Sequence, residues 1–203
     1  MKLLLATTNA NKVREIRPLL ADLPLEIVTL ADVPPIAEPP EIHLTFWENA
    51  RAKALAYAMA SGLTVVAEDS GLEITALGGA PGVHSARFLG ADVPYAIRFA
   101  EIQRRLMAFG PTQRDARFVT ALVVVSATHV LFETEAWVDG VVADAPAGAH
   151  GFGYDPIFFY PPLGKTTGEL TLDEKSAISH RARAFRDFGR FCRTSSSFFV
   201  LRS

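Results

Sequence analysis

The chain has 203 residues, of which 49% are hydrophobic and 21% charged, and its formal net charge is -2. This is the composition of a globular protein that is long enough to bury a core, which excludes a disordered chain. The small net charge excludes the global basic field of nucleic-acid-binding proteins, so no nucleic acid is expected as a partner. The single cysteine, Cys192, excludes an internal disulfide and favours a reducing, cytoplasmic compartment. The apolar run at residues 3–6 is too short for a signal peptide or a membrane span, so no membrane is expected as a partner.

The first third of the chain alternates short apolar runs with amphipathic segments. Lys2–Thr7 and Leu25–Leu30 are predicted to be strands, because each is a short apolar run bounded by turn residues. Asn9 is predicted to cap the helix between them. Thr45 to Met59 is predicted to be a helix that opens with a capping box, and Thr64–Ala67 a third strand.

The rest of the chain predicts further strands and two more helices. Leu72–Leu77 is expected to be extended, and Tyr95–Phe109 helical. Arg117–Ser126 and Val130–Val142 are rich in β-forming residues and predict a hairpin. Thr171 begins a second capping box and is expected to open one last helix. The apolar stripe of that helix consists of Ile178, Ala182, Phe185 and Cys192. This alternation indicates an α/β fold with a mixed sheet.

The polar turn after the first strand is the first candidate site. It contains Thr7, Thr8, Asn9, Ala10, Asn11 and Lys12. A turn between a strand and a helix presents unpaired N–H groups and the positive end of the helix dipole, which together form an anion site. No Walker A or GxGxxG motif occurs, so phosphates would be held in another way. The alternative is an Asn-capped surface helix with a solvated lysine.

Acidic residues form the second candidate site. Glu68 and Asp69 follow the predicted third strand, and ligands gather beyond the carboxyl ends of strands in α/β folds. Only one of the two acids should face such a site, where it could hold Mg²⁺ or orient a water. The alternative is an Asp-Ser-Gly turn. Glu41 lies in the loop before the helix that contains Lys53, and Lys53 either reaches phosphate or forms part of a solvated face.

A glycine-flanked aromatic loop near the end of the chain is the third candidate site. Phe152 and Tyr154 can stack on a base, with Gly151 and Gly153 allowing close backbone approach. The alternative is an aromatic plug in the core. Cationic residues follow at Lys175, His180 and Arg181, and their alternative is a solvated helix surface. An arginine there can donate to a 6-keto oxygen but not to a 6-amino group, which would favour inosine and xanthosine over adenosine.

Five motifs, in this order along the chain, resemble the Ham1/RdgB/inosine triphosphatase family. They are Ala6-Thr7-Thr8-Asn9 with Lys12, Thr45-Phe46 with Glu48-Asn49-Ala50 and Lys53-Ala54, Asp69-Ser70-Gly71-Leu72 with residues 78–87, Gly151 to Phe158, and Glu174-Lys175-Ser176 with Ser179-His180-Arg181. The resemblance covers about Lys2 to Arg190. It implies two α/β lobes around a long curved mixed sheet, with a nucleotide cleft between the lobes. It also implies a homodimer that hydrolyses ITP, dITP and XTP to the monophosphate and pyrophosphate with Mg²⁺.

The resemblance also implies roles for individual residues. Thr7 to Lys12 would meet the triphosphate, which Lys53 and Lys175 would help to position. Asp69 would be the general base and a metal ligand, with Glu41 the second ligand. The residues that would meet the substrate are Ser70, Phe152, Gly153, Tyr154, Asp155, Lys175, His180 and Arg181.

The domain organisation expected from the sequence is a single two-lobed domain at 1–193, followed by an atypical tail at 194–203. The chain has no internal repeat and no linker that would separate independent domains. Two other functions remain open: a Maf-type pyrophosphatase that acts on pyrimidine or modified nucleotides, and a nucleotide-binding regulator without catalysis. Comparing activity on a panel of nucleoside triphosphates would identify a Maf-type enzyme. An assay for pyrophosphate released from ITP would identify a regulator without catalysis.

Overall fold

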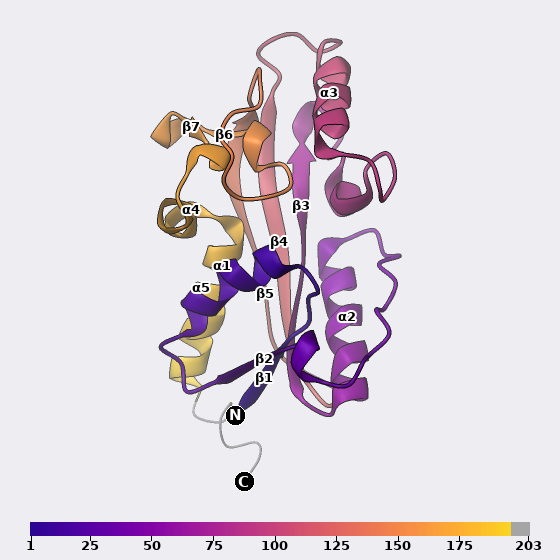
Figure 1. The fold of residues 1–203 in the computed structure, drawn as a ribbon, viewed down its shortest axis with the longest axis vertical. Helices are drawn as coiled ribbons and strands as arrows, with labels where there is room; N and C mark the ends of the chain where they lie inside the picture. Colours follow the sequence, from indigo (N-terminus) through magenta and orange to yellow (C-terminus); the bar gives the residue numbers. More distant parts are fainter. Residues whose placement is uncertain (196–203) are drawn as a thin grey trace. The chain divides into compact units, whose positions relative to one another are not determined.

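A computed structural model describes residues 1–195 of the chain. Its seven strands form one sheet in the order β2-β1-β3-β4-β5-β6-β7 (Figure 1). The strands are β1 Lys2–Leu5, β2 Glu26–Thr29, β3 Thr64–Ile74, β4 Asp115–Ser126, β5 His129–Val142, β6 Phe158–Tyr160 and β7 Lys165–Thr166. β1 runs parallel to β2 and β3, whereas β6 is antiparallel to β5 and β7. The predicted α/β fold with a mixed sheet and flanking helices is therefore confirmed.

The chain folds as two units that share this sheet. Unit 1 contains Met1–Asp69, Thr120–Ala136 and the chain from Arg181, and unit 2 contains Ser70–Val119 and Trp137–His180. β3, β4 and β5 each begin in one unit and end in the other. The predicted single domain at 1–193 and the predicted cleft between lobes stay predictions. The predicted tail lies outside the described residues from residue 196 onward.

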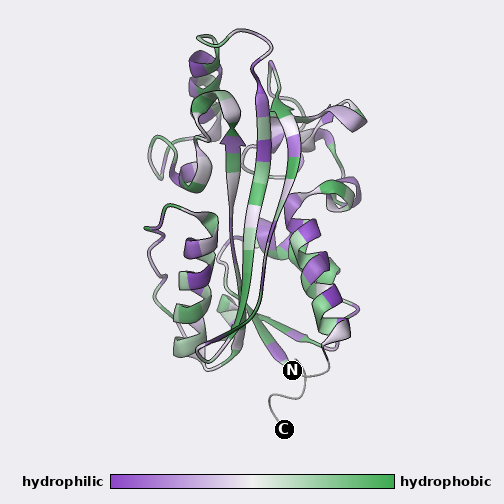
Figure 2. Cartoon of the chain, turned by 180° about the vertical axis from the view of Figure 1, so that it is seen from behind, coloured by the Kyte–Doolittle hydropathy of each residue, from purple (hydrophilic) through white to green (hydrophobic). Residues whose placement is uncertain are grey.

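Unit 1 packs helices against β1 and the adjoining strands. The helices are α1 Ala10–Leu20, α2 Phe46–Ser61 and α5 His180–Thr194, whose first residue belongs to unit 2. α1 and α5 share one core with the strands, with Ile16, Phe185 and Phe188 at its centre. α2 lies on the other side of these strands (Figure 1). Seen from behind, the hydrophobic residues gather along the central strands, while hydrophobic and hydrophilic residues alternate along the helices (Figure 2).

Unit 2 has its own core, centred on the aromatic residues Phe99, Phe118, Tyr154 and Phe158. Its α-helices are α3 Tyr95–Leu106 and α4 Leu172–Ile178. Short 3₁₀ helices complete the two units at Leu30–Asp32, Thr75–Leu77, Gly82–Arg87, Asp155–Ile157, Pro161–Leu163 and Thr167–Glu169. None of the helices in residues 1–195 has the length and the apolar character that crossing a membrane requires.

Most predicted elements are confirmed, because their local signals agree with their packing. The Asn9 side chain caps α1, Thr45 caps α2, and Gly62 ends α2 in the left-handed region. The predicted hairpin is β4 and β5, joined by the two residues 127–128.

The structure corrects several predicted boundaries. The segment Leu72–Leu77, predicted to be extended, is extended only to Ile74, because Thr75–Leu77 form a 3₁₀ helix. β3 does not stop at Ala67 but continues to Ile74, so Asp69 lies inside a strand and not beyond its end. Ser70 and Gly71, which are typical turn residues, are part of this strand where it passes from unit 1 into unit 2. The predicted last helix is two helices, because Ser179 is extended, with φ -65° and ψ 149°, between α4 and α5.

Candidate active site

The turn between β1 and α1 is held by its own side chains. Asn9 Oδ1 accepts from the N–H groups of Asn11 at 2.9 Å and Lys12 at 3.4 Å, and Thr7 Oγ1 accepts from the Asn9 N–H at 3.2 Å. Thr8 and Ala10 are exposed. The cap therefore already satisfies two of the amides at the start of α1.

Lys12 is not the solvated lysine of the alternative reading. Its Nζ lies 2.8 Å from Glu68 Oε1, and only 17% of its side chain is exposed. Arg181 Nε contacts the same oxygen at 3.2 Å, while Arg181 Nη1 contacts Glu15 Oε2 at 2.7 Å. Unit 1 therefore holds an ion-pair network in which the two cations alternate with the carboxylates Glu68 and Glu15.

Glu68 serves this network and not proton transfer. Burial opposes its ionisation, but Arg181 and Lys12 outweigh that effect and hold the pKa of the carboxyl well below its usual value. Its Oε2 accepts from Thr120 Oγ1 at 2.7 Å, so both carboxylate oxygens are engaged. A carboxylate in this state orients cations and is a poor proton acceptor.

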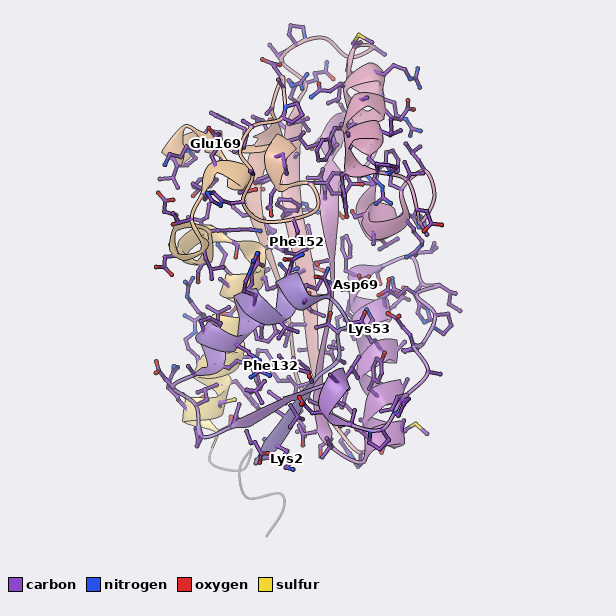
Figure 3. The ribbon with its side chains drawn as sticks, viewed as in Figure 1. Lys2, Lys53, Asp69, Phe132, Phe152 and Glu169 are labelled. Atoms are coloured by element: carbon purple, nitrogen blue, oxygen red, sulfur yellow. The ribbon has the colours of Figure 1, made fainter. Side chains whose placement is uncertain are left out.

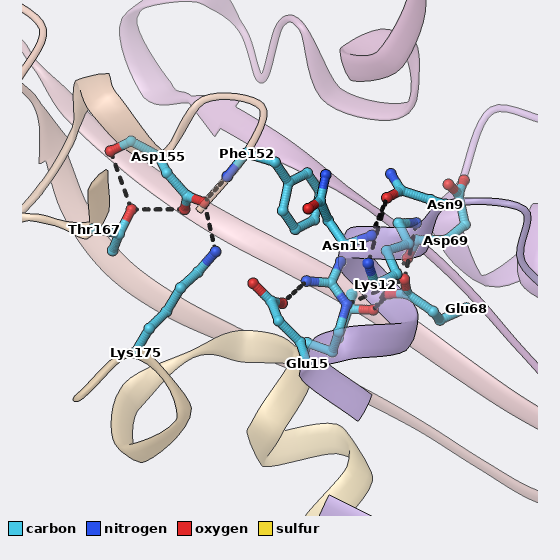
Figure 4. Close-up of polar contacts among 12 residues, drawn as sticks. Asn9, Asn11, Lys12, Glu15, Glu68, Asp69, Phe152, Asp155, Thr167 and Lys175 are labelled. Carbon is cyan, nitrogen blue, oxygen red and sulfur yellow. Dashed lines mark hydrogen bonds and ion pairs between the residues drawn. The ribbon is translucent and has the colours of Figure 1, made fainter. Parts of the chain in front are cut away.

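Asp69 is the next residue of β3, and its surroundings differ. Burial, followed by repulsion from Glu41, raises the pKa of its carboxyl to about 6, although Lys53 and Lys12 oppose the shift. Asn49 Nδ2 donates to Asp69 Oδ2 at 3.0 Å. A buried carboxyl whose pKa lies near neutrality is suited to general-base chemistry. The structure thus distinguishes the two adjacent acids. Glu68 contacts α1 and α5 (Figure 4). Asp69 contacts α2 through Asn49.

Lys53 lies on α2 and forms an ion pair with Glu41 of the preceding loop (Figure 3). Burial lowers the pKa of the Lys53 ammonium, but Glu41 outweighs that effect and raises it. In residues 1–195, no group of three or more His, Cys, Asp or Glu side chains is placed to hold a metal. Asp69 and Glu41 still fit a magnesium ion, because Mg²⁺ is commonly held by one or two carboxylates together with substrate phosphates. Glu41 lies close enough to Asp69 to raise its pKa.

In unit 2, Asp155 organises the glycine-flanked loop (Figure 4). Its Oδ2 accepts from the Phe152 N–H at 2.7 Å and from Lys175 Nζ at 2.5 Å, and its Oδ1 accepts from Thr167 Oγ1 at 2.8 Å. Lys175 Nζ also lies 5.0 Å from the centroid of the Phe152 ring. The sequence placed Lys175 on the phosphates, whereas the structure places it, 6% exposed, in a buried pair that fixes this loop.

The absence of a side chain at Gly151 makes room for the Asp155 carboxylate. Its φ is +74°, and a Cβ at this position would lie 2.1 Å from Asp155 Oδ2. Tyr154 is 3% exposed and donates from its hydroxyl to the Ser85 carbonyl, so it takes the core role of the alternative reading. Phe152, by contrast, is half-buried, and it is the ring of this loop with a partly exposed surface.

The remaining predicted residues divide between the units. Thr7 to Lys12, Glu41, Lys53, Asp69 and Arg181 belong to unit 1, and Ser70, Phe152 to Asp155, Lys175 and His180 belong to unit 2. His180 is buried and stacks on Phe118, with ring centroids 5.0 Å apart. Because α4 ends before Ser179, Lys175 and Arg181 lie on different helices in different units. The sequence predicted that they share one helix, which is wrong.

Sequence reasoning missed several polar residues that build these contacts. They are Glu15, Asn49, Thr120 and Thr167. Thr120 has a usable signal, because it is one hydroxyl in an apolar strand and a buried hydroxyl needs a partner. Asn49 belongs to one of the five motifs, but no local pattern identifies its contacts with the His43 N–H and with Asp69.

Comparison with known proteins decides the family. The Ham1 family model matches residues 3–191, which include every candidate site residue. The chain belongs to the Ham1 family. It is 45% identical over 188 residues to the dITP/XTP pyrophosphatase of Syntrophobacter fumaroxidans, covering 93% of this chain and 80% of that protein. It is 45% identical to the Geobacillus kaustophilus protein of the same name, covering 90% of each.

Solved structures of Ham1 proteins share the fold. The HAM1 protein of Coxiella burnetii superposes with a TM-score of 0.84 at 35% identity, over 96% of this chain and all of that one. The nucleoside-triphosphatase or dITP/XTP pyrophosphatase of Mycobacterium abscessus gives a TM-score of 0.75 at 39% identity, over 93% and 98% of the two chains. The family assignment therefore holds in both sequence and fold.

Proposed function

We propose that this Ham1-family enzyme hydrolyses deaminated purine nucleoside triphosphates, namely ITP, dITP and XTP, to the monophosphate and pyrophosphate. Its relatives named dITP/XTP pyrophosphatase are about 45% identical over nine-tenths of the chain. The observation that carries the proposal is the arrangement in unit 1, where the carboxylates Asp69 and Glu41 lie with Lys12 and Lys53. Carboxylates for a metal and cations for phosphate oxygens are what phosphoanhydride hydrolysis requires. Removing these nucleotides would prevent their incorporation into nucleic acid.

The reaction is an attack of water on the α-phosphorus. Asp69 orients the water and accepts its proton while the new P–O bond forms, the α–β phosphoanhydride bond breaks, and pyrophosphate leaves. Lys12, Lys53 and the turn from Thr7 to Asn11 hold the triphosphate. Asp69 and Glu41 would hold Mg²⁺, which would supply neutralisation of the phosphate charge. Positioning and electrostatic stabilisation carry most of the rate acceleration.

Base recognition is assigned to the loop of unit 2 and to Arg181. The half-buried Phe152 ring offers a stacking face, which is blind to the identity of the purine. We propose that Arg181 of unit 1, whose orientation Glu15 and Glu68 fix, donates to the 6-keto oxygen of the purine. A 6-amino group would face this donor unpaired, so adenine nucleotides are rejected.

The setting of the enzyme is part of the same proposal. We place it in the cytoplasm as a homodimer that uses Mg²⁺. The cytoplasmic assignment is supported by the single buried cysteine, which forms no disulfide framework. The dimer is supported by the family resemblance, and the choice of Mg²⁺ by its preference for sites of few carboxylates and phosphate oxygens.

The test is a panel assay with the full chain and Mg²⁺. ITP, dITP, XTP, ATP, dGTP and pyrimidine triphosphates are compared, and pyrophosphate and orthophosphate are measured separately. We expect pyrophosphate and no orthophosphate, with kcat/KM for ITP above that for ATP by about 10²-fold or more. Faster turnover of a pyrimidine triphosphate would support a Maf-type enzyme. Tight binding of ITP without any pyrophosphate would support a regulator and would end the proposal.

A further inference from the structure

The buried face of α2 presents two polar groups to two carboxylates. Asn49 and Lys53 are four residues apart, so they lie on the same face of the helix, one turn from each other. Asn49 Nδ2 contacts Asp69 Oδ2, and Lys53 Nζ contacts Glu41. The two carboxylates that the proposed function places on the metal are therefore both held by one helix of unit 1.

Asn49 has contacts at both ends of its amide. Its Nδ2 donates to Asp69 at 3.0 Å, and its Oδ1 accepts from the His43 N–H at 3.0 Å. A flipped amide would set oxygen against the carboxylate and NH₂ against an N–H donor, so both contacts would be lost. The side chain is 1% exposed, so water does not compete for these bonds. Its orientation is therefore fixed by its partners.

The second contact reaches the loop that carries Glu41. Residues 35–43 have no regular secondary structure, and His43 is two residues after Glu41. The bond from the His43 N–H to Asn49 therefore anchors this loop to the start of α2, close to Glu41. One amide thus connects the loop of one candidate metal ligand to the carboxylate of the other.

We infer that Asn49 is a positioning residue, which fixes the orientation of the Asp69 carboxylate and anchors the Glu41 loop to it. The inference rests on the proposed function, because its consequence appears in turnover. Groups that orient a ligating carboxylate typically contribute about 10–100-fold in activity. The triphosphate contacts of Lys12 and the Thr7–Asn11 turn do not involve Asn49, so substrate affinity should depend on it little.

The experiment compares Asn49→Ala, Asn49→Asp and the control Glu48→Ala. Asn49→Ala removes both contacts. Asn49→Asp is isosteric and keeps an oxygen for the His43 N–H, but it replaces the amide donor to Asp69 with a second carboxyl group. Glu48→Ala removes the bond that the Thr45 hydroxyl donates to Glu48 Oε2 at the exposed start of the same helix, and keeps the bond from the Glu48 N–H to Thr45. kcat and KM are measured with dITP at a Mg²⁺ concentration that saturates each variant, alongside Tm.

We expect kcat to fall by about 10-fold or more in both Asn49 variants, with KM within about 3-fold of wild type. Glu48→Ala should keep the wild-type kcat. Retention of kcat within about 2-fold by Asn49→Asp would overturn the inference, because loop anchoring alone would then suffice. A kcat loss equal in Glu48→Ala would overturn it as well. If Asn49→Ala does not fold, the kcat of Asn49→Asp alone tests the inference. A wild-type enzyme that releases no pyrophosphate would refute the proposed function itself, which is a separate result.

Discussion

At the scale of single residues, Glu68 and Asp69 show how neighbours in one strand acquire different chemistry. Successive strand residues point to opposite faces, so the side chains of Glu68 and Asp69 meet different helices. Glu68 meets Lys12 and Arg181 and stays ionised, whereas Asp69 meets Asn49, and burial together with Glu41 raises its pKa to about 6. Asp69 is therefore the residue of this strand that we propose as the base.

Substitution of Asp69 by Asn should remove turnover while leaving the fold intact. The amide keeps the shape of the side chain but cannot accept the proton of water, so kcat with dITP should fall by about 10²-fold or more. Asp139→Asn, on the exposed part of β5, is the matched control and should keep wild-type kcat. Pyrophosphate release measures both. Turnover of Asp69→Asn within a few-fold of wild type would place the base elsewhere.

Substitution of Arg181 by Ala should act on stability. It leaves Glu68 and Glu15 buried without their shared guanidinium, and breaking a buried pair in this way typically costs about 3–5 kcal/mol. Urea unfolding followed by circular dichroism gives the free energy of unfolding. Arg183→Ala, two residues along on the exposed side of α5, should stay within about 0.5 kcal/mol of wild type. An equal effect of the two substitutions would show that the ion-pair network does not stabilise unit 1.

At the scale of elements, the loop at residues 151–155 is held together by the close approach of its backbone at Gly151 to the carboxylate of Asp155. Asp155 connects the loop to Lys175 of α4 and to Thr167. The position of Phe152 is therefore set by a buried side chain three residues away, through the bond from its N–H.

A glycine pair tests this arrangement. Gly151 and Gly164 both have positive φ, but a Cβ at Gly151 would meet Asp155, whereas a Cβ at Gly164 would meet nothing within 4 Å. Gly164→Ala should cost about 1–2 kcal/mol from backbone strain alone. Gly151→Ala should cost more by at least about 1–3 kcal/mol, because Asp155 would lose bonds to charged or buried partners. Thermal and urea unfolding of the two variants measure the difference, and equal losses would contradict the close approach.

Much of the fold is predictable from the sequence because caps and apolar runs are local signals. Asn9, Thr45 and Gly62 mark helix ends through their own side chains or backbone, and the structure confirms each. The break at Ser179 is not predictable in this way, because the apolar spacing of Ile178, Ala182 and Phe185 continues across it. The continuation of β3 through Ser70 and Gly71 is not predictable either. These residues locally favour a turn, but the burial of the strand outweighs that preference.

The candidate site is predictable only in part. Asp69, Lys12 and Phe152 stand out by type and by position beside a strand, a turn or a pair of glycines. Their partners depend on contacts between segments far apart in the sequence: Arg181 lies 113 residues from Glu68 and 166 from Glu15. No local pattern contains that information, and so the sequence assigned Arg181 and Lys175 to the substrate without the carboxylates that they pair with.

At the scale of the whole molecule, the rate at which Cys192 reacts with a thiol reagent measures how readily the core of unit 1 opens. Cys192 is buried in the core that α1 and α5 share, and burial raises the pKa of its thiol to about 11. Only the thiolate reacts with disulfide reagents, and its fraction falls as the pKa rises above the ambient pH.

Labelling of Cys192 at pH 7.5 should therefore be slow in the folded protein. We expect it to be at least about 10³-fold slower than in 8 M urea, because the side chain reacts only after the core opens. The absorbance of the released thiol of the reagent gives the rate at each urea concentration. Rapid labelling without urea would show that α5 opens separately from the rest of unit 1.

The strands that pass between the units have a consequence for how such a protein can evolve. The chain leaves or re-enters unit 1 after Asp69, Val119, Ala136 and His180. Neither unit is therefore encoded by one uninterrupted stretch of the gene. A recombination event with a single breakpoint cannot exchange one whole unit for that of a related gene, because each unit consists of separate segments of the chain. Exchange of either whole unit between related genes requires a breakpoint at each of these four positions.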